Sequence, residues 1–204
     1  MGHAGQSSFF KSTQFHCQHG GELRRRRAGR GKRPLSTKDS LHVVFKMNRE
    51  SHRPGLRHRR SYALSMRVIG RYARRFFIKI IQLSIQGDHI HLLIRAQKTS
   101  HYHHFFRVVA GQIAQGLLPR VTDTPGADQK GANGPAKTGA KTGVTTKIKF
   151  WTYRPFSRVV KSWTAEKVVR NYIQLNEREA RGDFPYSKKR LSGLTPEQIQ
   201  ELWE

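Results

Sequence analysis

The sequence predicts an α+β fold, in which one antiparallel sheet carries helices on one face. Two kinds of apolar pattern alternate along the chain. Some stretches have period two, which is typical of half-buried strands, and others space their apolar residues three and four positions apart, as amphipathic helices do. The predicted order is strand, helix, strand, strand, helix, strand and a further helix. The first six elements form a βαββαβ unit, which is the ferredoxin-like arrangement.

The first strand and the first helix have clear periodicity. The strand is predicted over 40–47, where Leu41, Val43 and Phe45 alternate with residues of the opposite face. The helix is predicted from Arg59 to Phe76. The apolar stripe expected on this helix consists of Tyr62, Met66, Ile69, Tyr72 or Ala73, and Phe76.

A hairpin and a second helix follow. Residues 77–85 are rich in β-branched side chains and predict a strand, Gly87 and Asp88 form a tight connection, and residues 89–96 predict the returning strand. The second helix is predicted over 100–118. The stripe expected on it consists of Phe105, Val108, Val109, Gln112 and Ile113.

The last part of the domain is predicted to be a strand over 147–160 and then a helix over 164–180. Thr164 is the expected N-cap, Glu166 lies in the first turn, and Gly182 is a suitable stop. A short helix is expected within 194–204, because Thr195, Pro196 and Gln198 match the sequence of a helix start.

Composition divides the chain into four parts. Residues 1–36 contain two basic runs and little periodicity, and we expect a basic, disordered tail. Residues 37–182 hold the predicted domain. Within it, residues 120–146 are rich in Gly, Lys and Thr and predict a mobile insertion. Residues 183–204 form a C-terminal extension.

The charge of the chain favours a polyanionic partner. It has 39 Lys and Arg against 13 Asp and Glu, a formal net charge of +26 and a pI near 11.3. A charge of this size makes nucleic acid the leading partner, ahead of an anionic membrane surface. We see no apolar run of membrane-spanning length. The single cysteine, Cys17, rules out an intrachain disulfide and favours a reducing, intracellular setting.

Candidate functional residues occur in the stretch His89-Ile90-His91. Alternation places His89 and His91 on the same strand face, roughly 6.5–7 Å apart along the strand, close enough to share one cation or phosphate oxygen. Two hydrogen-bonded histidines on a polar face are the alternative. Farther along, Tyr172 and Asn176 are four apart and share a helix face, about 5–6 Å between Cβ atoms. In isolation such a pair is also compatible with a core position.

These motifs together resemble the HUH family of single-tyrosine transposases. His89-Ile90-His91 followed by Leu-Leu-Ile resembles its His-hydrophobic-His strand, residues 150–156 its Trp-containing strand, and residues 172–176 its tyrosine helix. The segment that continues to Gly182 is most similar to the REP-associated branch. The resemblance covers roughly residues 37–182. Glu177 stands where the family usually has a proline, and the 120–146 connection is longer than usual.

The resemblance implies an enzyme that nicks and joins single-stranded DNA in transposition and recombination. Tyr172 would be the nucleophile and would form a covalent phosphotyrosine link. His89, His91 and Asn176 would hold a divalent ion, Mg²⁺ or Mn²⁺. The implied partner is hairpin-forming single-stranded DNA, without a membrane; a monomer and a homodimer both remain open. We expect a cytoplasmic, nucleoid-associated protein.

Specific DNA contacts are less clear from the sequence. Candidate phosphate-binding residues are Arg67, Arg71, Arg74, Arg154 and Arg158. An alternative function is that of a domesticated relative that binds structured single strands without cutting them. The joint presence of both histidines, the tyrosine and the asparagine favours the enzyme.

Overall fold

The computed structural model describes residues 17–21, 32–51, 54–118 and 149–185 of the 204. Within these ranges it contains a sheet with the strand order β1-β5-β2-β4-β3, in which every neighbouring pair is antiparallel. The elements are β1 (Gln18–His19), β2 (Ser40–Lys46), α3 (Arg59–Arg75), β3 (Ile78–Ile85), β4 (His89–Ala96), α4 (Thr99–Leu117), β5 (Phe156–Val160) and α5 (Trp163–Arg181). The predicted α+β fold with its βαββαβ order is confirmed.

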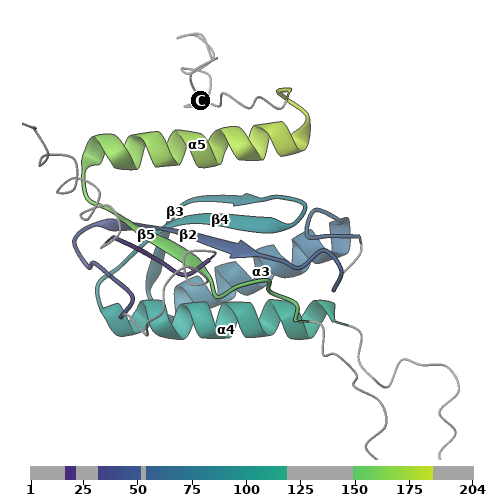
Figure 1. Ribbon diagram of the computed structural model, residues 1–204, viewed down its shortest axis with the longest axis horizontal. Coiled ribbons are helices and arrows are strands. Elements are labelled where there is room, and N and C mark those ends of the chain that lie inside the picture. The colour runs from purple at the N-terminus through teal and green to yellow at the C-terminus, as the bar shows by residue number, and fades with distance from the viewer. Residues whose placement is uncertain (1–16, 22–31, 52–53, 119–148, 186–204) are drawn as a thin grey trace, which may run out of the picture.

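The sheet is the middle of three layers. Helices α3 and α4 lie side by side on one face, and α5 crosses the opposite face (Figure 1). The main core fills the space between the sheet and the α3–α4 layer, where Leu41, Phe45, Ile90 and Leu92 are at most 1% exposed. A smaller apolar cluster of Leu93, Val160 and Ile173 joins the sheet to α5. The sheet therefore buries both faces, but only the α5 face is mixed with polar side chains.

The period-two prediction correctly assigns the faces of the central strands. In β4, Ile90, Leu92 and Ile94 belong to the main core, whereas Leu93 belongs to the α5 cluster. The end of β4 is held by Tyr102 of α4, whose buried hydroxyl oxygen accepts a 2.8 Å hydrogen bond from the backbone N–H of Ala96. Burial raises the pKa of this phenol, which keeps it protonated at neutral pH.

Three details of the predicted elements are wrong. Met66 is 39% exposed, and α3 instead buries Ser61, Ser65, Val68, Ile69 and Ala73, because small side chains allow the helix to approach α4 and the sheet closely. Phe77 does not begin β3: its φ of 51° ends α3 in a left-handed conformation. The strand predicted over 147–160 is regular only from Phe156, although Trp151 still forms an isolated bridge with Met47.

The helix α5 begins earlier than predicted. Its N-cap is Ser162, not Thr164, and the Ser162 hydroxyl accepts a hydrogen bond from the N–H of Ala165 at 3.1 Å. The end is as predicted: Gly182 is left-handed, with a φ of 91°, and its N–H bonds back to the last turn.

Part of the segment predicted to be a disordered tail is ordered. Gln18 and His19 form β1 and pair with Arg158 and Ser157 of β5. Arg33 donates a 2.6 Å hydrogen bond to the Ser157 hydroxyl. For these residues the expectation of disorder is wrong, because they cover the β5 edge of the sheet. The rest of that tail, the insertion 120–146 and the helix expected within 194–204 lie outside the described residues.

None of the helices in the described ranges combines the length and the apolar character needed to span a bilayer.

Candidate active site

The helix α5 runs antiparallel to β4 across the mixed face of the sheet. Glu166, near the start of α5, accepts a 3.0 Å hydrogen bond from Arg95 near the end of β4. One and a half turns later the Tyr172 ring lies 5.6 Å from the His91 ring, centroid to centroid. Another turn on, the backbone oxygen of Asn176 accepts a 2.7 Å hydrogen bond from Gln86, just before the hairpin turn. This alignment places the predicted tyrosine face over the predicted histidine face.

The two histidines of β4 are brought together as alternation predicts. Their ring centroids are 4.7 Å apart, with the rings nearly perpendicular. His91 is 5% exposed, whereas the His89 side chain is 32% exposed. The Nδ1 atom of His89 lies 2.6 Å from a carboxylate oxygen of Asp88, so its Nε2 atom is the nitrogen left for a ligand. A carboxylate in this position also fixes the orientation of the ring.

The charge state of Asp88 suits this contact with His89. Burial alone would raise its pKa, but the hydrogen bond and charge of His89 together with the neighbouring Arg49 outweigh burial, and the pKa lies below its usual value. Arg49 binds the other carboxylate oxygen at 3.1 Å. Asp88 is therefore an anion at neutral pH and a hydrogen-bond acceptor for the imidazole.

A third histidine, His42 of β2, belongs to the site and was missed by the sequence analysis. Its Nε2 atom lies 3.2 Å from Nδ1 of His91, and the two rings stack with centroids 5.4 Å apart. In the register Val44 is opposite His91, so His42 is the diagonal neighbour on the same face. Burial, followed by the charge of Arg158, lowers the pKa of His42 from 6.5 to about 4, so this ring is neutral near pH 7.

The neutral state of His42 bears on the tautomer of His91. A neutral His42 ring can accept at Nε2 while His91 donates from Nδ1, and in that tautomer the Nε2 atom of His91 carries the lone pair. The signal available in the sequence was that His42 lies on the polar face of a strand next to β4. That signal becomes specific only when the register of the two strands is known.

Tyr172 and Asn176 both face the sheet. Tyr172 is half-buried and packs against the Leu93, Val160 and Ile173 cluster. Asn176 is 2% exposed. Both side chains are thus on the side of α5 that packs toward the sheet, and Tyr172 is the one with a contact to a histidine ring, that of His91.

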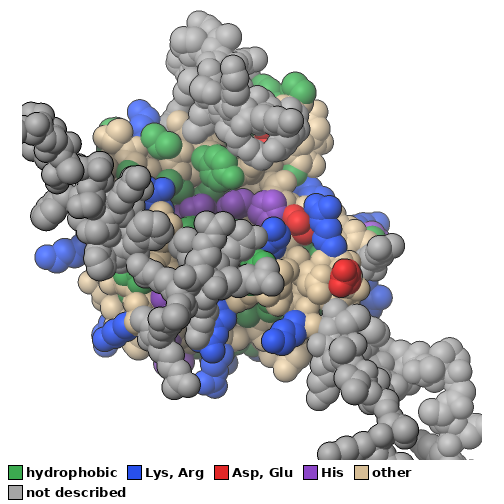
Figure 2. Space-filling view, viewed as in Figure 1, with side chains coloured by type: hydrophobic (Ala, Val, Ile, Leu, Met, Phe, Trp, Pro, Cys, Tyr) green, Lys and Arg blue, Asp and Glu red, His purple; other side chains and the backbone are tan. Residues whose placement is uncertain are grey.

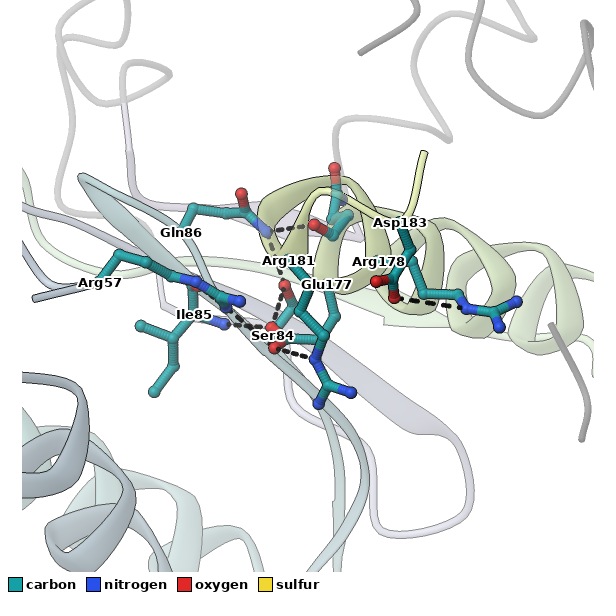
Figure 3. Close-up of polar contacts among 9 residues, drawn as sticks. Arg57, Ser84, Ile85, Gln86, Glu177, Arg178, Arg181 and Asp183 are labelled. Carbon is teal, nitrogen blue, oxygen red and sulfur yellow. Dashed lines mark hydrogen bonds and ion pairs between the residues drawn. The ribbon is translucent and has the colours of Figure 1, made fainter. Parts of the chain in front are cut away.

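Glu177 anchors the C-terminal half of α5 to the β3 edge (Figure 3). Its carboxylate accepts hydrogen bonds from Arg57 at 2.9 Å, from the Ser84 hydroxyl at 3.2 Å and from the N–H of Ile85 at 3.3 Å. Arg181, one turn later, binds the same carboxylate at 3.2 Å. With its side chain only 12% exposed, Glu177 connects α5, β3 and the segment before α3 beside the candidate site.

The predicted DNA-binding arginines do not lie on one surface. Arg158 is opposite His42 in the β2–β5 register and shares the face of the candidate site. Arg67, Arg71 and Arg74 are exposed on α3, beyond the other face of the sheet. Arg154 is exposed before β5. Figure 2 shows a band of histidine side chains on the visible face with Lys and Arg side chains around it.

The divalent ion implied by the resemblance requires a set of ligands whose chemistry suits it. The described ranges contain no group of three or more His, Cys, Asp or Glu side chains arranged to hold a metal. The predicted set is of another kind, with two imidazoles and one amide. Its chemistry fits a divalent ion, because the polar contacts of His89 and His91 described above are made through Nδ1, imidazole nitrogens are metal ligands, and an amide oxygen suits Mn²⁺ or Mg²⁺.

Comparisons with known proteins bear on the fold. A scan against protein-family models found no match for the chain, and a search of curated proteins found none either. A search of solved structures found the structure of a REP-associated tyrosine transposase bound to a REP hairpin, with a TM-score of 0.52 and 14% sequence identity. The match covers 83% of this chain and 90% of that chain. The chain therefore shares the fold of that transposase, as a distant structural relative.

Proposed function

We propose that this protein is a transposase-like enzyme that cuts and rejoins single-stranded DNA through Tyr172. The observation that carries the proposal is the approach of the Tyr172 ring to within 5.6 Å of His91, centroid to centroid, in one chain. A histidine pair on a strand facing a tyrosine and an amide on a helix is an arrangement suited to phosphodiester chemistry. The fold shared with a tyrosine transposase supports the same assignment.

The residues around the tyrosine would hold a divalent ion. His89 and His91 would bind it through their Nε2 atoms and Asn176 through its amide oxygen, with Asp88 and His42 orienting the two imidazoles. When bound, Mg²⁺ or Mn²⁺ polarises the scissile phosphate and neutralises charge on its oxygens. The protein's own contribution is to keep the donors and the tyrosine on facing surfaces.

The proposed reaction is a transfer of the phosphodiester to the tyrosine. The Tyr172 oxygen gives up its proton to solvent and attacks phosphorus, a P–O bond to Tyr172 forms, the P–O3′ bond breaks, and the leaving 3′-oxygen takes up a proton, so that the step consumes and releases no net proton. The DNA then has a free 3′-hydroxyl on one side and a 5′-phosphotyrosine link on the other. Attack by a 3′-hydroxyl on this link restores a phosphodiester and frees Tyr172, so rejoining needs no nucleotide cofactor.

The proposed substrate is single-stranded DNA that forms a hairpin. The +26 net charge favours a polyanion, and the structural neighbour was solved bound to a REP hairpin. Arg158 lies beside the site, where it can contact a phosphate of the reacting strand. The arginines of α3 and Arg154 are proposed to contact phosphates farther from the cut.

Covalent adduct formation tests this function. The full chain is incubated with labelled single-stranded hairpin oligonucleotides and Mn²⁺, and adducts are scored on denaturing gels. The wild type should form an adduct that Tyr172→Phe abolishes, while DNA affinity stays within a few-fold. Tyr72→Phe, which removes a phenol on α3 at the opposite face of the sheet, is the matched control. An adduct of normal yield in Tyr172→Phe would remove the tyrosine from the reaction, and binding without any adduct would support the non-cleaving alternative.

A further inference from the structure

An aromatic side chain is presented to solvent at the end of α3, away from the candidate active site. Phe77 is 73% exposed, and it is the only non-glycine residue with a positive φ, 51°, among those the structure describes. It follows the last turn of α3, a position at which a left-handed residue is usually glycine or asparagine. A bulky side chain is strained there, so the fold does not account for its choice.

The ring of Phe77 forms an aromatic pair with His101 in the first turn of α4. The ring centroids are 5.7 Å apart at an interplanar angle of 36°. Nδ1 of His101 is buried and has no hydrogen-bond partner in the described part of the chain. Next to this pair, His104 stacks on Phe76 at 5.8 Å. The result is a small surface of flat rings with one face of Phe77 open to solvent.

The surroundings of this pair are basic. Arg74 and Arg75 are exposed in the last turn of α3, and Lys98 is the exposed N-cap of α4. The first turn of α4 contains no acidic residue of its own, and the negative charge that acts on Tyr102 in this turn comes from Asp39, just before β2. Between residues 54 and 118 the only acidic side chain is Asp88, which lies at the opposite end of the β3–β4 hairpin. The basic side chains therefore favour an anionic ligand. The exposed ring of Phe77 favours a ligand that also carries a flat apolar group.

We propose that Phe77, paired with His101 and flanked by Arg74, Arg75 and Lys98, is a stacking site for an unpaired base of single-stranded DNA. Stacking on an aromatic ring combined with phosphate contacts from basic side chains is the common means of binding single strands. The inference rests on the proposed function for its partner and adds a second contact point for the same strand.

The position of Phe77 in the sheet separates this site from the chemistry. Ile78, the next residue, pairs with Ala96 at the end of β4. Ala96 is five residues beyond His91, which is about 17 Å along the strand. Because β3 is the edge strand, DNA can pass from the α5 face around this edge to Phe77 without crossing another strand.

Substitution of Phe77 by glycine gives a sharp test, because it removes the ring and suits the backbone. Binding of the full-length protein to a fluorescent 20-nucleotide oligo-dT, and to an abasic strand of equal length, is measured by anisotropy. We expect Phe77→Gly to weaken binding to oligo-dT by about tenfold and to leave binding to the abasic strand unchanged. The variant should melt at or above the wild-type temperature, because glycine suits the left-handed backbone. Phe77→Trp should retain binding. Val168→Ala, which truncates an exposed side chain on α5, is the control.

The outcomes separate the two proposals. Wild-type affinity for oligo-dT in Phe77→Gly, or an equal loss on the abasic strand, would overturn base stacking at Phe77 alone. Absence of any single-strand binding by the wild type would overturn the proposed function together with this site. A loss confined to strands that carry bases, at unchanged stability, supports the assignment.

Discussion

Nε2 of His42 lies 3.2 Å from Nδ1 of His91, and the two rings stack. This contact joins the two central strands of the sheet directly beneath Tyr172. It gives His91 a fixed orientation, in the same way that Asp88 fixes His89. Both histidines of the proposed ligand pair are thus supported at Nδ1 and directed through Nε2, although one support is an anion and the other a neutral ring.

The first prediction concerns this support. His42→Leu removes the partner of His91 Nδ1 and should weaken Mn²⁺ binding by about 10- to 100-fold, the usual range for lost support of a ligand. His42→Gln, whose amide oxygen can accept the same hydrogen bond, should retain more affinity. Isothermal titration of Mn²⁺ measures both. The control, His103→Ala, removes an exposed histidine of α4 and should leave the Mn²⁺ affinity unchanged. Equal Mn²⁺ affinities of His42→Leu and the wild type would contradict the supporting role of His42.

The second prediction concerns the amide ligand. Asn176→Asp places a carboxylate at a position that is 2% exposed. Without metal the buried charge should lower the melting temperature, whereas the stronger oxygen ligand should give a larger stabilisation by Mn²⁺ than in the wild type. Melting curves with Mn²⁺ and with EDTA measure this difference. A Mn²⁺-induced rise in melting temperature no larger than that of the wild type would argue against Asn176 as a ligand. In the wild type, removal of the metal with EDTA should also abolish the covalent adduct.

Much of this arrangement follows from periodicity. The spacing of His89 and His91 sets their common face in any strand, and the spacing of Tyr172 and Asn176 sets theirs in any helix. Periodicity does not give the register between strands that are distant in sequence, so His42 could not be connected to His91. It also does not give the backbone at element ends: Ser162 and Thr164 are both good caps, and Phe77 resembles a strand residue until its left-handed φ is seen.

The third prediction concerns Glu177, at the position where the family that this sequence resembles usually has a proline. Glu177→Gln keeps the side-chain size but removes the charge that binds Arg57 and Arg181. Because this carboxylate is mostly buried, we expect a loss of about 1–3 kcal/mol in the free energy of unfolding, with faster amide hydrogen exchange in α5. Asp183→Asn, which affects the exposed ion pair with Arg178, is the control. Equal exchange rates in the two variants would show that Glu177 does not hold the helix.

The fourth prediction concerns which subunit supplies the tyrosine. Two anchors hold α5 over its own β4, Glu166 with Arg95 at one end and Glu177 with Arg57 at the other. Between them Tyr172 lies beside His91 of the same chain. We therefore expect the tyrosine to act on the phosphate held by its own histidines.

Mixing two inactive variants measures this directly. One variant carries His89→Ala and His91→Ala, and the other carries Tyr172→Phe. If the tyrosine acts within its own chain, no mixture can combine an intact histidine pair with an intact tyrosine, and adduct yield should stay at background. If α5 is exchanged between subunits, a mixed dimer restores one complete site, and adducts should appear in proportion to its abundance. Recovery of adducts in the mixture would contradict the arrangement in which both anchors of α5 hold it over its own sheet.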